Sequence, residues 1–505
     1  MSVPDLFKIV ARGLQDTRLQ PKMRSLADLS QYITVYKSTT RWAAQLVRVD
    51  FDTNPDFGLQ ASVTLPRKYD FVHRLLLTVV LPDIYGPQSN ASIAAATAGN
   101  TFLGPYFSWT NSVGHALIAS VDLEIGGTRV ASLDGRLLEV LDEFYESPEK
   151  LRAKNVMIGR SANYSVQSVI GPILHIPLPF WFTQHLAQSL PIEALSVDTV
   201  RLQINFNPVS SIYYTSARGT DFTVYSAEPP MVIPPLEGAV FYQTSASGSL
   251  LYNVSDTTPH FGVKGIVIPN NSIPSKLSMV DCYLLAEYIS VDDYETVNLR
   301  NADLEYKVPL YNAVAPEDTK GQQFLRTPIL YNNPTQDILW FFHNPVADLF
   351  NQPFLATRDL SGCSIGTVAS VPWLPDGTGF AYAYSEPLAN VALTFNGVQR
   401  FSHSEPSLFR SLLPLIHYRK APEIWRYYYL YTFSHGAGAW DDKELGNPYI
   451  PKGLANFDKI LRKEMVFTLQ ADRFGSYPNL TLYLWTTTWN ILRIYGGRGA
   501  FLFAI

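Results

Sequence analysis

The chain has little cysteine and little charge. Only Cys282 and Cys363 among its 505 residues are cysteines, and charged residues make up 16%. Two isolated thiols form neither a disulfide framework nor a zinc cluster, so a reducing compartment is the simplest expectation. The net charge of −5 excludes the chain-wide basic field that is typical of nucleic-acid-binding proteins, and we expect no direct binding of nucleic acid.

Long apolar runs are also missing. No run reaches the roughly 18 residues that a membrane-spanning helix needs. The first residues, MSVPDLFKIVARGLQD, carry acidic and basic side chains within their apolar stretch, so we expect no signal peptide. Residues 1–25 are instead expected to form an N-terminal arm, in which Leu6, Ile9, Val10 and Leu14 have helical spacing.

The sequence lacks the common motifs of enzymes. Its nine histidines show no HExxH pattern, and neither a G-x-S-x-G elbow nor a P-loop occurs. Residues 52–58 resemble part of a calcium loop, but Pro55 intrudes and no closing glutamate follows. We therefore expect a protein that is not an enzyme, with no catalytic residue, metal site or cofactor. Asp441 and Asp442 could imitate the paired carboxylates of a glycosidase, which leaves a carbohydrate-active β-sandwich protein as an alternative.

Aromatic residues, proline and glycine are plentiful. Aromatics make up 13% of the chain, with 35 prolines and 30 glycines. This composition favours strands, turns and large buried or interfacial surfaces over helices. The best helix candidate is 133–146, where Leu137, Leu141 and Phe144 share one face and Asp134 can cap the N-terminus.

One strand pattern occurs twice. Val121, Leu123 and Ile125 alternate with polar residues before a Gly-Gly turn, and 391–397 repeats the pattern before Asn-Gly, 270 residues later. A turn ending at Asp70 leads into one apolar strand, and in the second half a turn at 331–334 leads into a similar strand that begins at Asp337, 267 residues after Asp70. Two agreeing offsets near half the chain length predict two copies of one β domain.

Several segments have a specific expectation. The apolar run Arg74–Leu81 predicts a strand buried on both faces. Residues 83–108 are expected to be a long loop, and 207–280 long loops with a few short strands, because both are rich in small, polar and turn-forming residues. The apolar tail 500–505 predicts a final core strand. We place the first domain at 26–297 and the second at 298–505.

Beyond its composition, the chain resembles the major capsid proteins of the nucleocytoplasmic large DNA viruses. The matching segments occur in the family's order and cover most of the chain. They are WTNSVGHALIASVDLEIGGTRVASLDG (109–135), IPLPFWFTQHLAQSLPIEALSVDTVRLQI (176–204), 288–295, NGVQRFS (396–402), 451–457 and WNILRIYGGRGAFLF (489–503).

Within these segments we single out structural motif residues that match the family. In the first half they are Trp109, Asn111, Gly114, Gly126, Gly127, Arg129, Pro177, Pro179, Phe180, Trp181 and Pro191. In the second half they are Asn396, Gly397, Arg400, Pro451, Gly453, Asn456, Phe457, Asn490, Arg493 and Gly496.

The resemblance implies an all-β fold of two consecutive eight-stranded jelly rolls, with long loops and a few short helices. It also implies a homotrimeric, pseudo-hexagonal capsomer that tiles the icosahedral shell of a virion assembled at cytoplasmic factories. Implied partners are other copies of the chain, minor capsid and penton proteins, and the inner viral membrane or its proteins. A paralogous minor capsid or scaffold protein of the same fold remains an alternative.

Five N-x-S/T sequons occur, and we treat them as weak candidates for glycosylation because chance supplies several in a chain of this length. They begin at Asn90, Asn163, Asn253, Asn270 and Asn479.

Overall fold

The structure is a computed structural model of the whole chain. It describes residues 41–97, 99, 101–104, 106–160, 173–216, 236–238, 242–244, 273–358, 386–401, 405–418, 420–422, 426–434, 453–472 and 475–503. The chain divides into a short unit, Met1–Ala43, and a large unit, Ala44–Ile505, and the strands below belong to the large unit apart from the first two residues of β1. The expected N-terminal arm, 1–25, lies outside the described residues.

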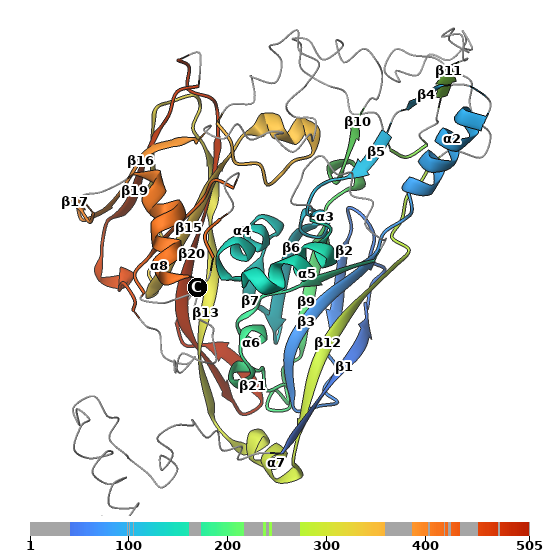
Figure 1. Cartoon of the computed structure of the whole chain (residues 1–505). Helices are drawn as coiled ribbons and strands as arrows, with labels where there is room; N and C mark the ends of the chain where they lie inside the picture. Colours follow the sequence, from blue (N-terminus) through green and yellow to red (C-terminus); the bar gives the residue numbers. More distant parts are fainter. Residues whose placement is uncertain are drawn as a thin grey trace, which may run out of the picture. The chain divides into compact units, whose positions relative to one another are not determined.

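The first half of the large unit is a sandwich of two four-stranded sheets, which we call the first roll (Figure 1). The sheet orders are β1-β12-β3-β8 and β2-β9-β6-β7. The strands are β1 (Trp42–Asp50), β2 (Gln60–Thr64), β3 (Phe71–Val80), β6 (Ile118–Ile125), β7 (Thr128–Leu133), β8 (Ile173–Pro177), β9 (Val200–Phe206) and β12 (Asp281–Val291).

The second half repeats this architecture as the second roll. The sheet orders are β13-β20-β15-β18 and β14-β19-β16-β17, and β21 pairs with β20. The strands are β13 (Leu304–Asp318), β14 (Phe324–Pro328), β15 (Thr335–His343), β16 (Leu388–Phe395), β17 (Val398–Gln399), β18 (Tyr428–Thr432), β19 (Lys463–Leu469), β20 (Thr481–Tyr495) and β21 (Arg498–Phe501).

Both rolls have the same topology. With the eight strands of each numbered along the chain, leaving β21 aside, the sheet orders are 1-8-3-6 and 2-7-4-5 in both. This order is that of the jelly roll, so the fold predicted from the repeat and the resemblance is confirmed. The repeated patterns are equivalent strands: Val121 and Val391 lie in the fourth strands, and Asp70 and Asp337 lie at the start of the third.

Each roll is closed by apolar side chains that alternate along its strands. In the first roll Val121, Leu123 and Ile125 are at most 1% exposed. In the second, Trp340 is completely buried against Phe409, Tyr429 and Phe467 from three other elements. Because successive strand residues point to opposite faces, this alternation fixes which face of each sheet forms the core.

The helices lie in the connections between strands. Among the described residues, no helix is long and apolar enough to cross a membrane. The helices are α2 (Tyr85–Thr97), α3 (Val113–Ala116), α4 (Gly135–Tyr145), α5 (Pro148–Ile158), α6 (Trp181–Gln184), α7 (Asp293–Asn301), α8 (Leu413–His417), the π-helical turn η7 (Leu408–Leu412), and the 3₁₀ turns η2 (Leu186–Gln188), η3 (Val209–Ser211), η5 (Pro345–Phe350) and η8 (Phe457–Lys459).

Two local predictions need correction, those for 83–108 and for the C-terminal tail. Residues 83–108 are not an irregular loop, because alanine-rich α2 and two short strands, β4 (Thr101–Gly104) and β5 (Tyr106–Trp109), form there. Alanine stabilises a helix without an apolar periodicity that would reveal it. In 207–280 the described parts include η3 and two short strands, β10 (Tyr213–Ser216) and β11 (Tyr242–Thr244), which agrees with the expectation of loops with a few short strands. The tail strand β21 is an edge strand, exposed or half-buried at each position, rather than a core strand.

The strand β3 also differs from its prediction. Its inward side chains are buried; on the other side Thr78 is buried, but Arg74 is exposed and Leu76 and Val80 are half-buried. The strand β3 is therefore buried throughout on one face and only in part on the other. The expected domain boundary at residue 298 lies in α7, which connects β12 to β13, and remains a prediction.

Candidate functional site

The glycine motifs lie in tight hairpin turns. Gly126 and Gly127 have φ of 59° and 79°, Asn396 and Gly397 have 51° and 83°, and Gly496 and its neighbour Gly497 have 57° and 79°. Two consecutive positive φ values are the signature of the type I′ turn, whose twist matches that of the flanking strands. The pattern Gly-Gly or Asn-Gly is required there because other residues are strained at these angles.

The third of these turns fastens the second roll to the first. The carbonyl oxygen of Gly497 accepts hydrogen bonds from the backbone N–H groups of Val197 (3.0 Å) and Asp198 (3.2 Å). The N–H of Gly499 donates to Asp198 Oδ2 at 3.0 Å. A Cβ atom on Gly497 would overlap Ser196 Oγ, so only glycine permits this approach.

The motif around Trp109 lines the end of the first roll. Trp109 is 6% exposed and stacks on Phe57, with ring centroids 6.5 Å apart. Asn111 Oδ1 accepts a hydrogen bond from the backbone N–H of Ser112 at 3.0 Å. Gly114 lets α3 pack closely, because a Cβ atom there would lie 2.9 Å from Ile176 Cγ1.

The segment after β8 is a buried corner. Phe180, Trp181 and Pro191 are buried, while Pro177 and Pro179, which are half-buried, flank the end of β8. Prolines suit this corner because their backbone nitrogen has no hydrogen to satisfy.

In the second roll, the described motif residues close the entry to β19. Phe457 packs edge-on against Phe395 and Phe433, and Asn456 Oδ1 accepts the N–H of Asp458 at 3.2 Å. A Cβ atom on Gly453 would lie 2.6 Å from the Phe433 carbonyl oxygen. Pro451 lies outside the described residues.

The remaining motif residues make polar contacts near strand ends. Asn490 Nδ2 donates to the carbonyl oxygen of Phe503 at 2.8 Å, which fixes the chain after β21. Arg493 pairs with Glu305 at 2.6 Å, Arg129 lies 3.8 Å from Asp122, and Arg400 covers the ring of Phe395 at 4.9 Å. None of the described motif residues forms a catalytic group, and their assignment as family-motif sites remains a prediction.

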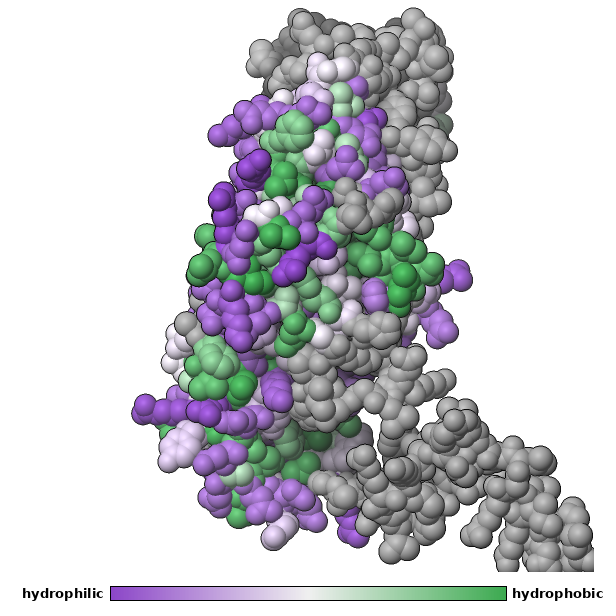
Figure 2. All heavy atoms as spheres, turned by 90° about the vertical axis from the view of Figure 1, so that its left-hand side faces the viewer, coloured by the Kyte–Doolittle hydropathy of each residue, from purple (hydrophilic) through white to green (hydrophobic). Residues whose placement is uncertain are grey.

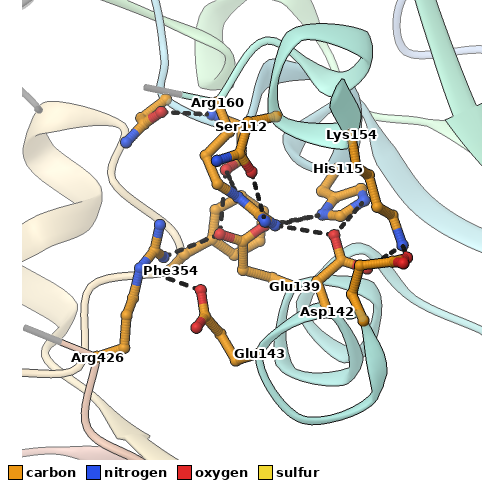
Figure 3. Close-up of polar contacts among 12 residues, drawn as sticks. Ser112, His115, Glu139, Asp142, Glu143, Lys154, Arg160, Phe354 and Arg426 are labelled. Atoms are coloured by element: carbon orange, nitrogen blue, oxygen red, sulfur yellow. Dashed lines mark hydrogen bonds and ion pairs between the residues drawn. The ribbon is translucent and has the colours of Figure 1, made fainter. Parts of the chain in front are cut away.

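A feature that sequence reasoning missed is a buried ionic cluster around α4 (Figure 3). The predicted helix is confirmed, and Asp134 Oδ1 caps it by accepting the Leu137 N–H at 2.8 Å. Its other face carries Glu139, which is completely buried. The Glu139 carboxylate contacts His115 Nδ1 at 2.8 Å, Arg426 Nη1 at 2.8 Å, and Arg160.

The cluster is neutral only when both rolls contribute. The first roll supplies four carboxylates but two cations, and the second roll supplies the other two cations. The carboxylates are Glu139, Asp142, Glu143 and Glu146; the cations are Lys154 and Arg160, then Lys420 and Arg426. A buried charge without a partner is strongly destabilising, so the first roll requires the second to neutralise this face.

The carboxylates of Glu139 and Asp142 are ionised in this environment. Burial alone would raise the pKa of Glu139, but the guanidinium groups of Arg160 and Arg426 and the hydrogen bond from His115 hold it well below its usual value of 4.5. Burial opposes ionisation of Asp142 as well, and Lys154 together with His115 and Arg160 lowers its pKa. Lys154 shows the complementary shift, with its pKa raised by Asp142 and Glu146 against burial. The cluster is therefore a set of true ion pairs.

A second group of contacts joins α4 to the outer face of the sheet containing β15 and β20. The Tyr145 hydroxyl donates to Asp337 Oδ2 at 2.9 Å, and Trp485 Nε1 donates to Asp134 Oδ2 at 2.9 Å. The Arg136 guanidinium lies 4.4 Å from the centre of the Tyr483 ring. Burial raises the pKa of Asp337, and its hydrogen bonds only partly offset this effect.

The sequence contained one signal for these contacts. In α4 the polar face carries Glu139, Asp142 and Glu143, and the only basic residue of the helix is Arg136. A solvated acidic face usually has basic neighbours at i±3 or i±4. An acidic stripe with so little compensation indicates cations supplied from elsewhere in the fold.

The structure does not test the other candidates, which remain predictions. Asn90 lies in α2 and is exposed; Asn479 is exposed and accepts the Lys320 N–H at 2.7 Å; and Asn163, Asn253 and Asn270 lie outside the described residues. The acidic pair at 441–442 also lies outside them. Within the described part of the chain, no group of three or more His, Cys, Asp or Glu residues could hold a metal ion.

Comparison with known proteins agrees with the topology. Residues 30–230 match the family described as "Major capsid protein N-terminus". The chain is 20% identical to "Probable capsid protein 4" of Acanthamoeba polyphaga mimivirus, over 99% of this chain and 98% of that protein. It is also 20% identical to the "Major capsid protein" of Phaeocystis pouchetii virus, over 99% of each chain.

A solved structure has the same fold. The "PBCV-1 virus capsid, quasi-atomic model" superposes with a TM-score of 0.65 at 18% identity, covering 94% of this chain and 100% of that one. The two jelly rolls of identical strand order, the matched segment and the full-length relatives agree with one another. Over nearly its whole length the chain is similar to the major capsid proteins of the nucleocytoplasmic large DNA viruses, and its residues 30–230 match the N-terminal part of that family.

Proposed function

We propose that this chain is a major capsid protein that assembles into homotrimeric, pseudo-hexagonal capsomers, which tile the icosahedral outer shell of a large DNA virus. The observation that carries the proposal is the identical 1-8-3-6 and 2-7-4-5 strand order of the two rolls. Three chains with two equivalent rolls each present six similar units around one axis, and a six-sided block can tile a surface.

The contact between the rolls suits this role. Ion pairs of α4 with Arg426 and Lys420, and the Gly497 turn on 197–198, hold one roll against the other at several separate points. A shell subunit needs such a fixed geometry, because lateral contacts between capsomers are individually weak and add up only when many form together.

The proposal extends to partners and location. The capsomers would occupy the outer shell of the virion, after assembly in the host cytoplasm at viral factories. They would contact one another, the penton and minor capsid proteins, and the membrane or membrane proteins beneath the shell. No catalytic step is part of this function, which consists of self-association.

Sedimentation of the purified chain tests the proposal. A stable species of about 170 kDa, three times the 56.6 kDa of one chain, is expected from the closed ring of a homotrimer. Negative-stain images of that species should show six-sided particles. A folded chain that stays monomeric at high concentration would contradict the proposal. Copy number in purified virions separates a major shell protein, present in great excess, from a paralogous minor protein of the same fold.

A further inference from the structure

The contact between the rolls is asymmetric, because a helix of the first roll packs on a sheet of the second. Since the two rolls have the same topology, each side of this contact has an equivalent on the other roll. The first helix after strand 5 of the first roll, α4, packs on the outer face of the second roll's sheet through Tyr145 and Asp134. That sheet is consequently covered on both sides, and every residue of β15 is buried. The second roll thus receives the first roll's helix.

Among the described residues, the corresponding helix of the second roll has no such cover. After strand 5 of the second roll, β17, come η7 and α8. Their side chains Leu412, Leu415 and Ile416 are 48%, 75% and 56% exposed. Figure 2 shows the side of the molecule that carries the second roll, where apolar residues gather in patches among polar ones. This exposed apolar helix face is equivalent to the face of α4 that packs on a sheet, and we call it the donor half of the contact.

The equivalent of the sheet that receives α4, which we call the acceptor half, is the outer face of the β1-β12-β3-β8 sheet. No described segment covers this face of the first roll. At the offset of 267 that relates Asp70 to Asp337, Arg74 of β3 takes the place of Phe341, and Arg74 is exposed where Phe341 is buried. Leu76 and Leu285, opposite each other on neighbouring strands of this face, are half-buried. The apolar run of β3 has the composition of a strand covered on both faces, yet no described segment of the single chain covers one of them.

The charges on this face are compatible with burial. Arg74 lies 3.6 Å from Glu287, and Arg48 binds Asp281 at 3.0 Å. Paired charges and half-buried leucines can be covered without leaving an isolated ion behind, unlike a face of single charges.

A second pair of equivalent positions supports the same contact. Gly126 N–H donates to the Thr199 carbonyl (3.0 Å) as Asn396 N–H donates to that of Arg462 (2.8 Å), so Leu461 takes the place of Asp198. Asp198 binds the segment that follows strand 8 of the second roll, at Gly499. Leu461 is 94% exposed.

The corresponding segment after strand 8 of the first roll is α7. It exposes Tyr294 (75%) and Val297 (53%). The first turn of α7 is acidic, with Asp293 and Glu295. These features complement the exposed Leu461 and its exposed basic neighbours on the second roll.

We propose that η7, α8 and Leu461 of one copy dock on the outer face of the β1-β12-β3-β8 sheet and on α7 of a second copy, as α4 and Asp198 dock on the second roll within the chain. The occupant of the uncovered sheet is thus the chain itself. The contact joins two different surfaces, so it closes as a ring when three copies alternate it with the contact inside each chain. This inference rests on the proposed trimer and names the surfaces that form it.

Cysteine cross-linking in the full-length chain tests the contact. One variant combines Leu415→Cys with Arg74→Cys, and a second combines Leu461→Cys with Val297→Cys. Under mild oxidation, each double variant is expected to give covalent dimers and trimers on a non-reducing gel, while each single variant and the wild type run as monomers. The matched control combines Leu415→Cys with Ile93→Cys, because Ile93 in α2 is 61% exposed but outside the proposed surface.

Sedimentation of the same samples distinguishes a wrong docking surface from the absence of a trimer. If both double variants sediment as trimers but run as monomers on the gel after oxidation, the proposed docking surface is wrong although the trimer exists. Another segment of the chain then covers the sheet. Efficient cross-linking of the control pair also overturns it. A wild-type chain that forms no trimer overturns the proposed function, and this inference with it.

Discussion

At the scale of single residues, Glu139 depends on partners from three separate segments. It is fully buried, and its carboxylate meets His115, Arg160 and Arg426, the last of which comes from the second roll. Such a group contributes little net stability compared with an apolar residue, but removing one partner leaves an uncompensated charge in a dry site. The fold is therefore sensitive to any change in this set.

We expect Glu139→Gln to lower the free energy of unfolding by roughly 3–5 kcal/mol, because Arg160 and Arg426 then lose their shared carboxylate. The control Glu305→Gln breaks the pair with Arg493, in which both side chains are about half exposed (54% and 52%). That exposed pair should contribute less than about 1 kcal/mol to the free energy of unfolding. Denaturant unfolding monitored by tryptophan fluorescence checks both values; equal losses would contradict a special role of the cluster.

Cys282 is a buried thiol in β12 whose pKa burial raises to about 12, with a smaller contribution from Asp281. Because the thiolate is the reactive form, we expect Cys282 to resist a thiol reagent at pH 8 in the native protein and to react fully after unfolding. The experiment uses a Cys363→Ser variant, so that a single thiol is counted. Rapid labelling of the native protein would show that β12 opens readily.

At the scale of elements, the β20–β21 hairpin shows how a turn can act as a fastener. Gly497 and Gly475 have nearly the same positive φ, 79° and 81°. They differ in surroundings, because a Cβ atom on Gly475 meets nothing within 4 Å whereas one on Gly497 overlaps Ser196 Oγ. Comparing substitutions at these two glycines therefore separates the cost of backbone strain from the cost of a poorer fit of the hairpin on the first roll.

We expect Gly475→Ala to cost about 1–2 kcal/mol through its left-handed backbone alone. Gly497→Ala should cost more, because the hairpin must also move away from 196–198 and lose the hydrogen bonds to Val197 and Asp198. Unfolding titrations measure the difference, and limited proteolysis should cut the C-terminal hairpin faster only in Gly497→Ala. Equal costs would show that the hairpin does not hold the rolls together.

At the scale of the whole molecule, acid should weaken the contact between the rolls. The pKa values of Glu139 and Asp142 are lower in the folded chain than their ordinary 4.5 and 3.8. A carboxylate whose pKa falls on folding stabilises the fold above its unfolded pKa, and this stabilisation is lost as the pH falls through the folded value. Buried Asp134 and Asp337, with raised pKa values, act in the opposite sense.

The linkage predicts how Glu139→Gln compares with the wild type across pH. The difference in unfolding free energy should be constant from pH 7 to about pH 5, then shrink in more acidic solution as Glu139 takes up a proton. Unfolding titrations at several pH values measure this difference. For the exposed control Glu305→Gln the small difference should change little, and a gap for Glu139→Gln that persists at the lowest pH would contradict the assignment.

Much of the fold could be predicted from local pattern. The alternation of Val121, Leu123 and Ile125 and its repeat at Val391 identified equivalent strands, because side-chain period and turn chemistry are properties of short segments. Helix α4 was predicted from an apolar face and the cap Asp134 for the same reason. Helix α2 was missed, because alanine stabilises a helix without marking a buried face.

Short segments of sequence were enough to specify the strands, the type I′ turns and the doubling of one β domain, since each depends on residues close together in the chain. Which faces are covered depends on how distant segments pack. The tertiary structure buries Glu139 against Arg426 across 287 positions, and it leaves one face of the apolar strand β3 only partly buried. The physical reason is that burial and charge pairing depend on distances between segments far apart in sequence, which no local pattern contains.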